Sequence, residues 1–126
     1  MNVLIIALDA VIPAEVTDAE VLVVAPALNS RLRRWVSDED EARRRAEQLA
    51  RTFVGLLARG GVCAKGRVGD ADPILAIADA LPTFPADEIV IAGRPEQLRK
   101  LDELVSRGRD RFAFPIRAAG SLPKAA

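Results

Sequence analysis

The stretch of this sequence that most suggests chemistry runs from Ile89 to Lys100 and reads IVIAGRPEQLRK. Its apolar half is typical of a buried strand, and Gly93 with Arg94 is typical of a turn into a helix. In an α/β protein, such a turn can bring backbone N–H groups and the positive end of a helix dipole to a phosphate. Gly93 and Arg94 are therefore candidate ligand-binding residues.

A second candidate for anion binding is the segment RLRRW, which places Arg31, Arg33 and Arg34 beside Trp35. Arginines interleaved with an aromatic residue can hold an anion, a nucleotide or single-stranded nucleic acid. An acidic run, Asp38–Glu41, follows almost at once and can neutralise the arginines. We therefore favour an interpretation in which this loop packs on the end of a sheet, and keep Arg31 and Arg33 as the alternative binding residues.

Other kinds of site are excluded by residue type. The 126 residues contain no histidine and one cysteine, Cys63. Catalytic triads that use histidine, histidine-ligated zinc, cysteine clusters and internal disulfides are therefore ruled out. Cys63 falls in a predicted strand, so we expect a buried, inert thiol. No P-loop, G-x-G-x-x-G or G-x-S-x-G motif occurs, and we predict no metal and no catalytic residues.

The composition predicts one folded domain. Half of the residues are hydrophobic, 29% are charged, and the formal net charge is zero. Such a chain is expected to fold around a single core over residues 1–126. Because positive and negative charges balance, we do not expect it to bind nucleic acid or an anionic membrane. The first residues, MNVLIIALDA, lack the basic region of a signal peptide, so we expect a cytoplasmic protein that does not associate with membranes.

Strands and helices alternate along the chain. Apolar runs predict strands over 3–8, 21–25, 62–68, 88–92 and 112–116, and helical periodicity predicts helices over 37–61, 73–81 and 96–107. This alternation predicts a doubly wound, mainly parallel five-stranded α/β sheet of flavodoxin-like or Rossmann-like type. The mixed pattern of 62–68 and the proline in 112–116 favour edge positions, and 118–126 is expected to be a flexible tail.

Local signals support the helix boundaries. Ser37 is a predicted N-cap, and Gly60 or Gly61 can end the same helix in the left-handed conformation. Asp72 is placed to cap the next helix, with Pro73 in its first turn. The predicted inward residues of that short helix are Ile74, Leu75, Ala78 and Leu81.

The connection between the first two strands is unusually short. Only about twelve residues, DAVIPAEVTDAE, separate them, near the minimum for a crossover that contains a helix. If the strands are parallel, this helix is shortened to about one turn or missing, and part of one sheet face lacks its usual cover. We therefore predict a homodimer. An antiparallel pair would relieve the short length but break the α/β pattern.

Taken together, these segments resemble the universal stress proteins, a flavodoxin-like α/β family, over most of the chain. The similar segments are VLIIALDA, PALNSRLRRWVSDEDEA, VGDADPILAIADAL, DEIVIAG and FAFPIRA. The resemblance implies that Asp9 matches an aspartate at the adenine end of a bound nucleotide. It also implies that Gly69 matches a glycine beside the ribose. Without a ligand, Asp9 is a polar loop carboxylate and Gly69 is a turn glycine with positive φ.

The family's phosphate loop is missing from the corresponding place. ATP-binding members carry Gly-x2-Gly-x9-Gly-Ser/Thr after the fourth strand. Starting from Gly93, the second glycine falls on Glu96 and the closing pair falls on Ser106 and Arg107. Pro95 lacks an N–H group and is expected to start a helix at once, with Glu96 in its first turn opposing a phosphate. Arg94 is then expected to pair with Glu96 or another nearby acid.

Three hypotheses follow for function. The leading one is a small, non-enzymatic universal-stress-like protein with a regulatory or stress-response role, which is not a standard ATP binder and has no resident cofactor. The second is a non-standard nucleotide or small-anion binder that uses Asp9, Gly69, Gly93 and Arg94 with Arg31 and Arg33, and ATP or another adenine nucleotide is its candidate ligand. The third, an enzyme of the same nucleotide-binding superfamily, has the least support because no catalytic constellation is present.

Overall fold

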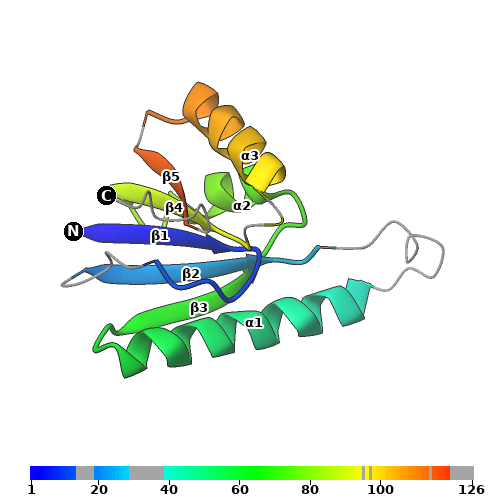
Figure 1. The fold of residues 1–126 in the computed structure, drawn as a ribbon, viewed down its shortest axis with the longest axis vertical. Coiled ribbons are helices and arrows are strands. Elements are labelled where there is room, and N and C mark those ends of the chain that lie inside the picture. The colour runs from blue at the N-terminus through cyan, green and yellow to red at the C-terminus, as the bar shows by residue number, and fades with distance from the viewer. Residues whose placement is uncertain (14–18, 29–38, 95, 97, 114, 120–126) are drawn as a thin grey trace.

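The protein is a five-stranded parallel sheet with helices on both faces (Figure 1). The computed structural model describes residues 1–13, 19–28, 39–94, 96, 98–113 and 115–119. The strands are β1 (Asn2–Ala7), β2 (Glu20–Pro26), β3 (Ala64–Gly69), β4 (Glu88–Ala92) and β5 (Ile116–Ala119). The helices are α1 (Glu39–Arg59), α2 (Pro73–Ala80) and α3 (Leu98–Arg111). The strand order is β3-β2-β1-β4-β5, which confirms the predicted α/β fold and both predicted edges.

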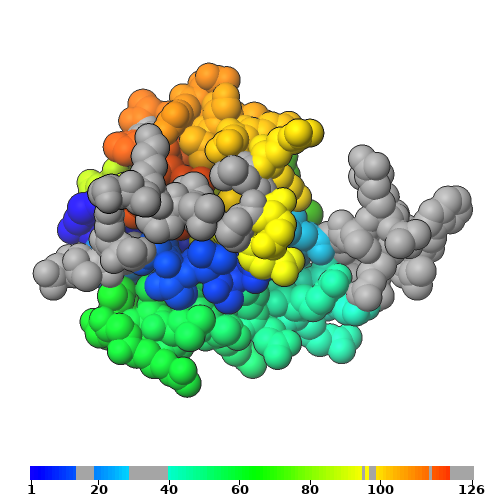
Figure 2. All heavy atoms as spheres, viewed as in Figure 1, coloured from blue at the N-terminus to red at the C-terminus, as the bar shows by residue number. Residues whose placement is uncertain are grey.

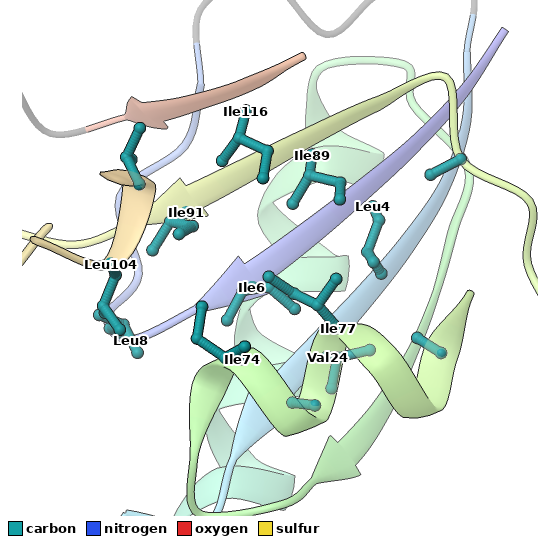
Figure 3. Close-up of a cluster of buried hydrophobic side chains, with 14 of the residues drawn as sticks. Leu4, Ile6, Leu8, Val24, Ile74, Ile77, Ile89, Ile91, Leu104 and Ile116 are labelled. Atoms are coloured by element: carbon teal, nitrogen blue, oxygen red, sulfur yellow. The ribbon is translucent and has the colours of Figure 1, made fainter. Parts of the chain in front are cut away.

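Side chains of the central strands are buried on both faces because helices cover both. Ile5 and Val23 point toward α1, where they pack in one cluster with Phe53. Ile6 and Ile91 point the opposite way and pack against α2 and α3 (Figure 3). Each such buried aliphatic side chain contributes about 1.5–3 kcal/mol, so the sheet is the main source of stability.

The first two strands are parallel, in register from Asn2 opposite Glu20 to Ile6 opposite Val24. The antiparallel alternative is therefore wrong. The described part of their connection, residues 8–13 and 19, contains no helix, while 14–18 lie outside the described residues. Val3, Ile5 and Val90 on this face are nevertheless buried within the single chain. Exposed sheet therefore gives no argument for a dimer, and the dimer stays a prediction.

Two helix ends follow the expected signals. Gly61 has a φ of 83°, and the Val62 N–H donates to the Leu57 carbonyl at 2.9 Å beyond the end of α1. Asp72 caps α2 by accepting from the Ile74 N–H at 2.9 Å, with Pro73 as the first helical residue. The predicted cap Ser37 lies outside the described residues.

The inward face of α2 differs from the prediction. Its buried residues are Pro73, Ile74, Ala76, Ile77 and Ala80. Ile74 is buried as predicted, but Leu75 is 41% exposed, and Ala78 and Leu81 are only partly buried. The prediction was wrong for Leu75 because a helix of eight residues shows too few turns for its periodicity to define a face.

Helix α3 extends further than predicted, to Arg111 instead of Arg107, and β5 begins at Ile116 instead of ending there. Gly108 continues the helix because its missing side chain leaves room for Ile116, whose Cδ1 would lie 2.7 Å from an added Cβ. The Arg109 guanidinium donates to the Ile116 carbonyl at 3.0 Å and joins helix to strand. The strand also includes residues 118 and 119, which the predicted tail of 118–126 had placed outside it.

Cys63 is exposed, just before β3, and not buried as predicted. The edge strand begins one residue later, so no neighbouring element covers the thiol. None of the helices that the structure describes is both long enough and apolar enough to span a membrane.

Candidate functional site at the carboxyl ends of β1 and β4

The candidate ligand site lies at the carboxyl ends of β1 and β4, a region called here the mouth of the sheet. The chain builds the sheet outward from β1 in one direction to β3, then returns to place β4 on the other side of β1. Ligands of doubly wound folds bind beyond the carboxyl ends of the strands at such a switch point. Ala7 and Ala92 are paired at these two ends, and Asp9 and Arg94 lie two residues beyond them.

Backbone N–H groups at this mouth are already used within the sheet. The Leu8 N–H donates to the Ala92 carbonyl at 2.8 Å, and the Asp9 N–H approaches the same oxygen at 3.3 Å. The N–H of Gly93, which is buried, donates to the Ala119 carbonyl of β5 at 3.0 Å. The glycine that matches the start of a phosphate loop therefore has no free N–H to offer a phosphate.

Arg94 lies between two carboxylates. Its Nε is 2.6 Å from Asp9 Oδ2 and 3.6 Å from Glu96 Oε2. The other oxygen of Asp9 accepts from the Ala10 N–H at 2.8 Å. The predicted pairing of Arg94 with nearby acids is thus confirmed, and Asp9, not Glu96, is the nearer partner.

The pair between Asp9 and Arg94 is partly exposed. Their side chains are 34% and 60% exposed, so water screens the attraction, and such pairs contribute about 0–1 kcal/mol. An anion could therefore take the place of Asp9 at little cost in stability. Among the residues that the structure describes, the site has no nucleophile next to a base, and no cluster of metal-ligating side chains occurs. The arrangement is suited to exchange of charged partners.

Glu96 does not lie where the sequence predicted. Helix α3 begins at Leu98 and has no acidic residue in its first turn, so Glu96 precedes the helix by two residues. Glu96 acts at the mouth through its ion pair with Arg94. Pro95, the predicted start of the helix, lies outside the described residues.

Gly69 is separated from the mouth, because it ends β3 and β2 lies between β3 and β1. Its predicted positive φ is wrong, since Gly61 is the one glycine with that geometry in the described residues. Instead, an added Cβ would lie 2.5 Å from Val24 Cγ1 and 3.1 Å from Ala76 Cβ. Gly69 is therefore needed for α2 to lie close against the sheet.

The structure thus brings together Asp9, Gly93 and Arg94 and places Gly69 elsewhere. The candidates Arg31 and Arg33 lie in 29–38, outside the described residues.

A further groove lies at a different place and was missed from the sequence. It runs between α1 and the edge strand β3 and has a volume of about 640 Å³. Its charged lining residues are Arg43, Glu47, Arg51 and Arg67. The first three are spaced four residues apart, which puts them on one face of a helix, and this spacing was the available signal.

We also compared the chain with known proteins. Neither a known protein family nor a curated protein matches it. The universal-stress resemblance therefore rests on the sequence segments alone.

Proposed function

We propose that the protein is a small, non-enzymatic, universal-stress-like regulatory protein whose switch-point crevice is not a standard ATP site. The observation that carries this proposal is the ion pair between Asp9 and Arg94 at the mouth. A phosphate loop offers free N–H groups and uncompensated positive charge. Here the Gly93 N–H is bound to β5 and the arginine faces two carboxylates. The resemblance suggests the regulatory or stress-response role, and the N-terminal residues suggest the cytoplasmic location. The homodimer was predicted from the short connection between the first two strands.

Calorimetric titration with ATP, AMP and cyclic nucleotides tests this proposal. We expect no binding with a Kd below about 100 μM, which corresponds to a binding free energy of about −5.5 kcal/mol, because one arginine already paired with two carboxylates offers a phosphate little attraction. Tighter binding that Asp9→Ala abolishes would overturn it. Asp79→Ala is the matched control, because Asp79 is an exposed carboxylate of α2 away from the mouth.

A second candidate function is supported by the exposure of Arg94. Because its guanidinium is 60% exposed and its partners are exchangeable, the crevice could receive a small anion or a nucleotide phosphate in place of Asp9. Inorganic pyrophosphate is a suitable probe. Binding that is lost in Arg94→Ala and kept in Arg99→Ala, an exposed arginine of α3, would favour this candidate over the first.

A further inference from the structure

The groove between α1 and β3 has an exposed sheet edge as one wall. β3 is the last strand of the sheet on this side, and its residues Lys65, Gly66 and Arg67 are exposed. Helix α1 lies along the strand and forms the outer surface of the molecule there (Figures 1 and 2). Ala50 and Val54 of α1 and Val68 of β3 add apolar lining.

Alternate backbone groups of β3 face away from the sheet. The Gly69 carbonyl accepts from the Ala27 N–H, so Gly69 is directed toward the β2 side. Because successive residues of a strand direct their N–H and C=O groups to opposite sides, Ala64, Gly66 and Val68 direct theirs to the free edge. An edge of this kind can pair with an added strand.

Both faces of that edge carry positive charge. An added Cβ on Gly66 would point at Val54 and Ala50, so Gly66 faces α1, and its neighbours Lys65 and Arg67 face the other way. This agrees with the contact of Arg67 with the Thr83 hydroxyl, at 3.5 Å. On the α1 side, Arg43 and Arg51 flank the groove. A strand added at this edge would have arginine or lysine beside both rows of its side chains.

The arginines are weakly held. Arg51 pairs with Glu47 at 3.2 Å, but the two side chains are 79% and 56% exposed. No hydrogen bond or ion pair connects Arg43 to another residue that the structure describes. The four charged residues that line the groove leave two positive charges uncompensated.

A glycine on the helical wall also keeps the groove open. Gly55 lies inside α1 and lines the groove, and nothing lies within 4 Å of the position that its Cβ would occupy. Glycine destabilises a helix relative to alanine, and packing does not require it at this position. The absence of a side chain leaves space beside the sheet edge.

We propose that this edge binds an extended acidic peptide as a sixth strand, with carboxylates facing Arg43 and Arg51 on one side and Lys65 and Arg67 on the other. Arg43 and Arg51 are eight residues apart on α1, which is about 12 Å along the helix. An extended chain covers that distance in about four residues. A second copy of this chain fits the edge poorly, because its own β3 would place lysine and arginine against the same charges.

A fluorescent peptide, Ser-Glu-Glu-Glu-Glu-Ser, tests the proposal by anisotropy, with glutamine in place of glutamate as its control. We expect salt-dependent binding to the glutamate peptide, which Arg43→Ala with Arg51→Ala weakens at least tenfold. The matched pair Arg44→Ala with Arg45→Ala removes the same charge from exposed positions of α1 outside the groove, and we expect less than a threefold change. Equal losses in both pairs, or no binding to the unaltered protein, would overturn the proposal.

Two further measurements distinguish strand addition from simple attraction of charge. Bound peptide should slow hydrogen exchange at the amides of Gly66 and Val68 and leave those of Lys65 and Arg67 unchanged. N-methylation of alternate peptide residues should weaken binding at least tenfold. Unchanged hydrogen exchange would contradict strand addition, and so would an N-methylated peptide that binds as well as the unmodified one. The proposal would also be contradicted if single-stranded DNA bound equally well and Arg43→Ala with Arg51→Ala weakened that binding.

Discussion

The mouth of the sheet and the groove beside β3 both contain arginine, but they differ in how far carboxylates balance its positive charge. At the mouth, Arg94 meets two carboxylates, and one of them, Asp9, follows a strand that is far away in the sequence. In the groove, the charged lining residues are three arginines, Arg43, Arg51 and Arg67, and one carboxylate, that of Glu47, which pairs with Arg51. The residues that resemble a ligand site therefore form a compensated pair, and the uncompensated charge lies at a sheet edge where no motif was expected.

Packing shows the same contrast. At the end of β3, an added Cβ on Gly69 would clash with Val24 at 2.5 Å, so the contact of α2 with the sheet is closed. On α1, an added Cβ on Gly55 would meet nothing within 4 Å. Helix α2 therefore lies close against the sheet at Gly69. Helix α1 also packs closely on β3, at Gly66, but it faces open space at Gly55 beside the groove. The open space at Gly55 and the excess positive charge of the groove thus occur together.

The largest expected effect tests whether α1 is a fixed wall of the groove. Phe53 is fully buried between α1 and the sheet. Phe53→Ala should lower the free energy of unfolding by about 3–5 kcal/mol, measured by urea denaturation, because it leaves a large cavity. Leu56→Ala, a partly buried position on the same helix, is the control and should cost less. A loss below about 1 kcal/mol for Phe53→Ala would show that α1 is held loosely.

The next effect tests the closed contact of α2. Gly69→Ala should cost about 1–3 kcal/mol, since Val24 or α2 must move to admit the methyl group. Gly66→Ala is the matched control on the same strand and should cost less, because its nearest contacts would be longer, 3.1 Å to Val54 Cγ2 and 3.3 Å to Ala50, against 2.5 Å at Gly69. Thermal unfolding of both variants gives the comparison. If Gly66→Ala were the more damaging substitution, the assignment of the two contacts would be reversed.

These residues also show what could be predicted from the sequence. The parallel α/β sheet followed from apolar runs such as residues 3–8 and from the alternation of strands with helices, and Asp72 with Pro73 defined the start of α2. Local signals of this kind depend only on near neighbours in the chain. The pairing of Arg94 with Glu96 was predicted for the same reason, whereas its closer pairing with Asp9 depends on a contact across the fold.

Features that depend on contacts across the fold could not be predicted. Nothing near Gly69 in the sequence indicates that Val24 approaches it, so the presence of glycine at this position was attributed to a turn. The extension of α3 through Gly108 likewise depends on Ile116, which packs against it from the next strand. The groove was missed because Arg43 and Arg51 become its wall only when α1 lies along the edge strand β3.

A smaller effect, of opposite sign, tests the open side. Gly55→Ala should raise the free energy of unfolding by about 0.5–1 kcal/mol, because alanine is the better helix former and its Cβ meets open space. The same substitution should weaken the acidic peptide if the space is used for binding. Urea denaturation and anisotropy on one protein sample measure both. If the protein became more stable and its affinity for the peptide did not change, Gly55 would not contribute to peptide binding.

The smallest expected effect on stability comes from a substitution at the mouth, and the same substitution should change the affinity for an anion. Asp9→Asn keeps an oxygen for the Ala10 N–H but removes the charge that faces Arg94. Because the pair is partly exposed, the free energy of unfolding should fall by no more than about 1 kcal/mol. Arg94 is then less compensated, so the affinity for pyrophosphate should rise severalfold. Asp79→Asn, remote from the mouth, should change neither quantity. If Asp9 were itself a ligand-binding residue, its substitution would instead lower the affinity, so the sign of the change decides whether this carboxylate closes the crevice or serves it.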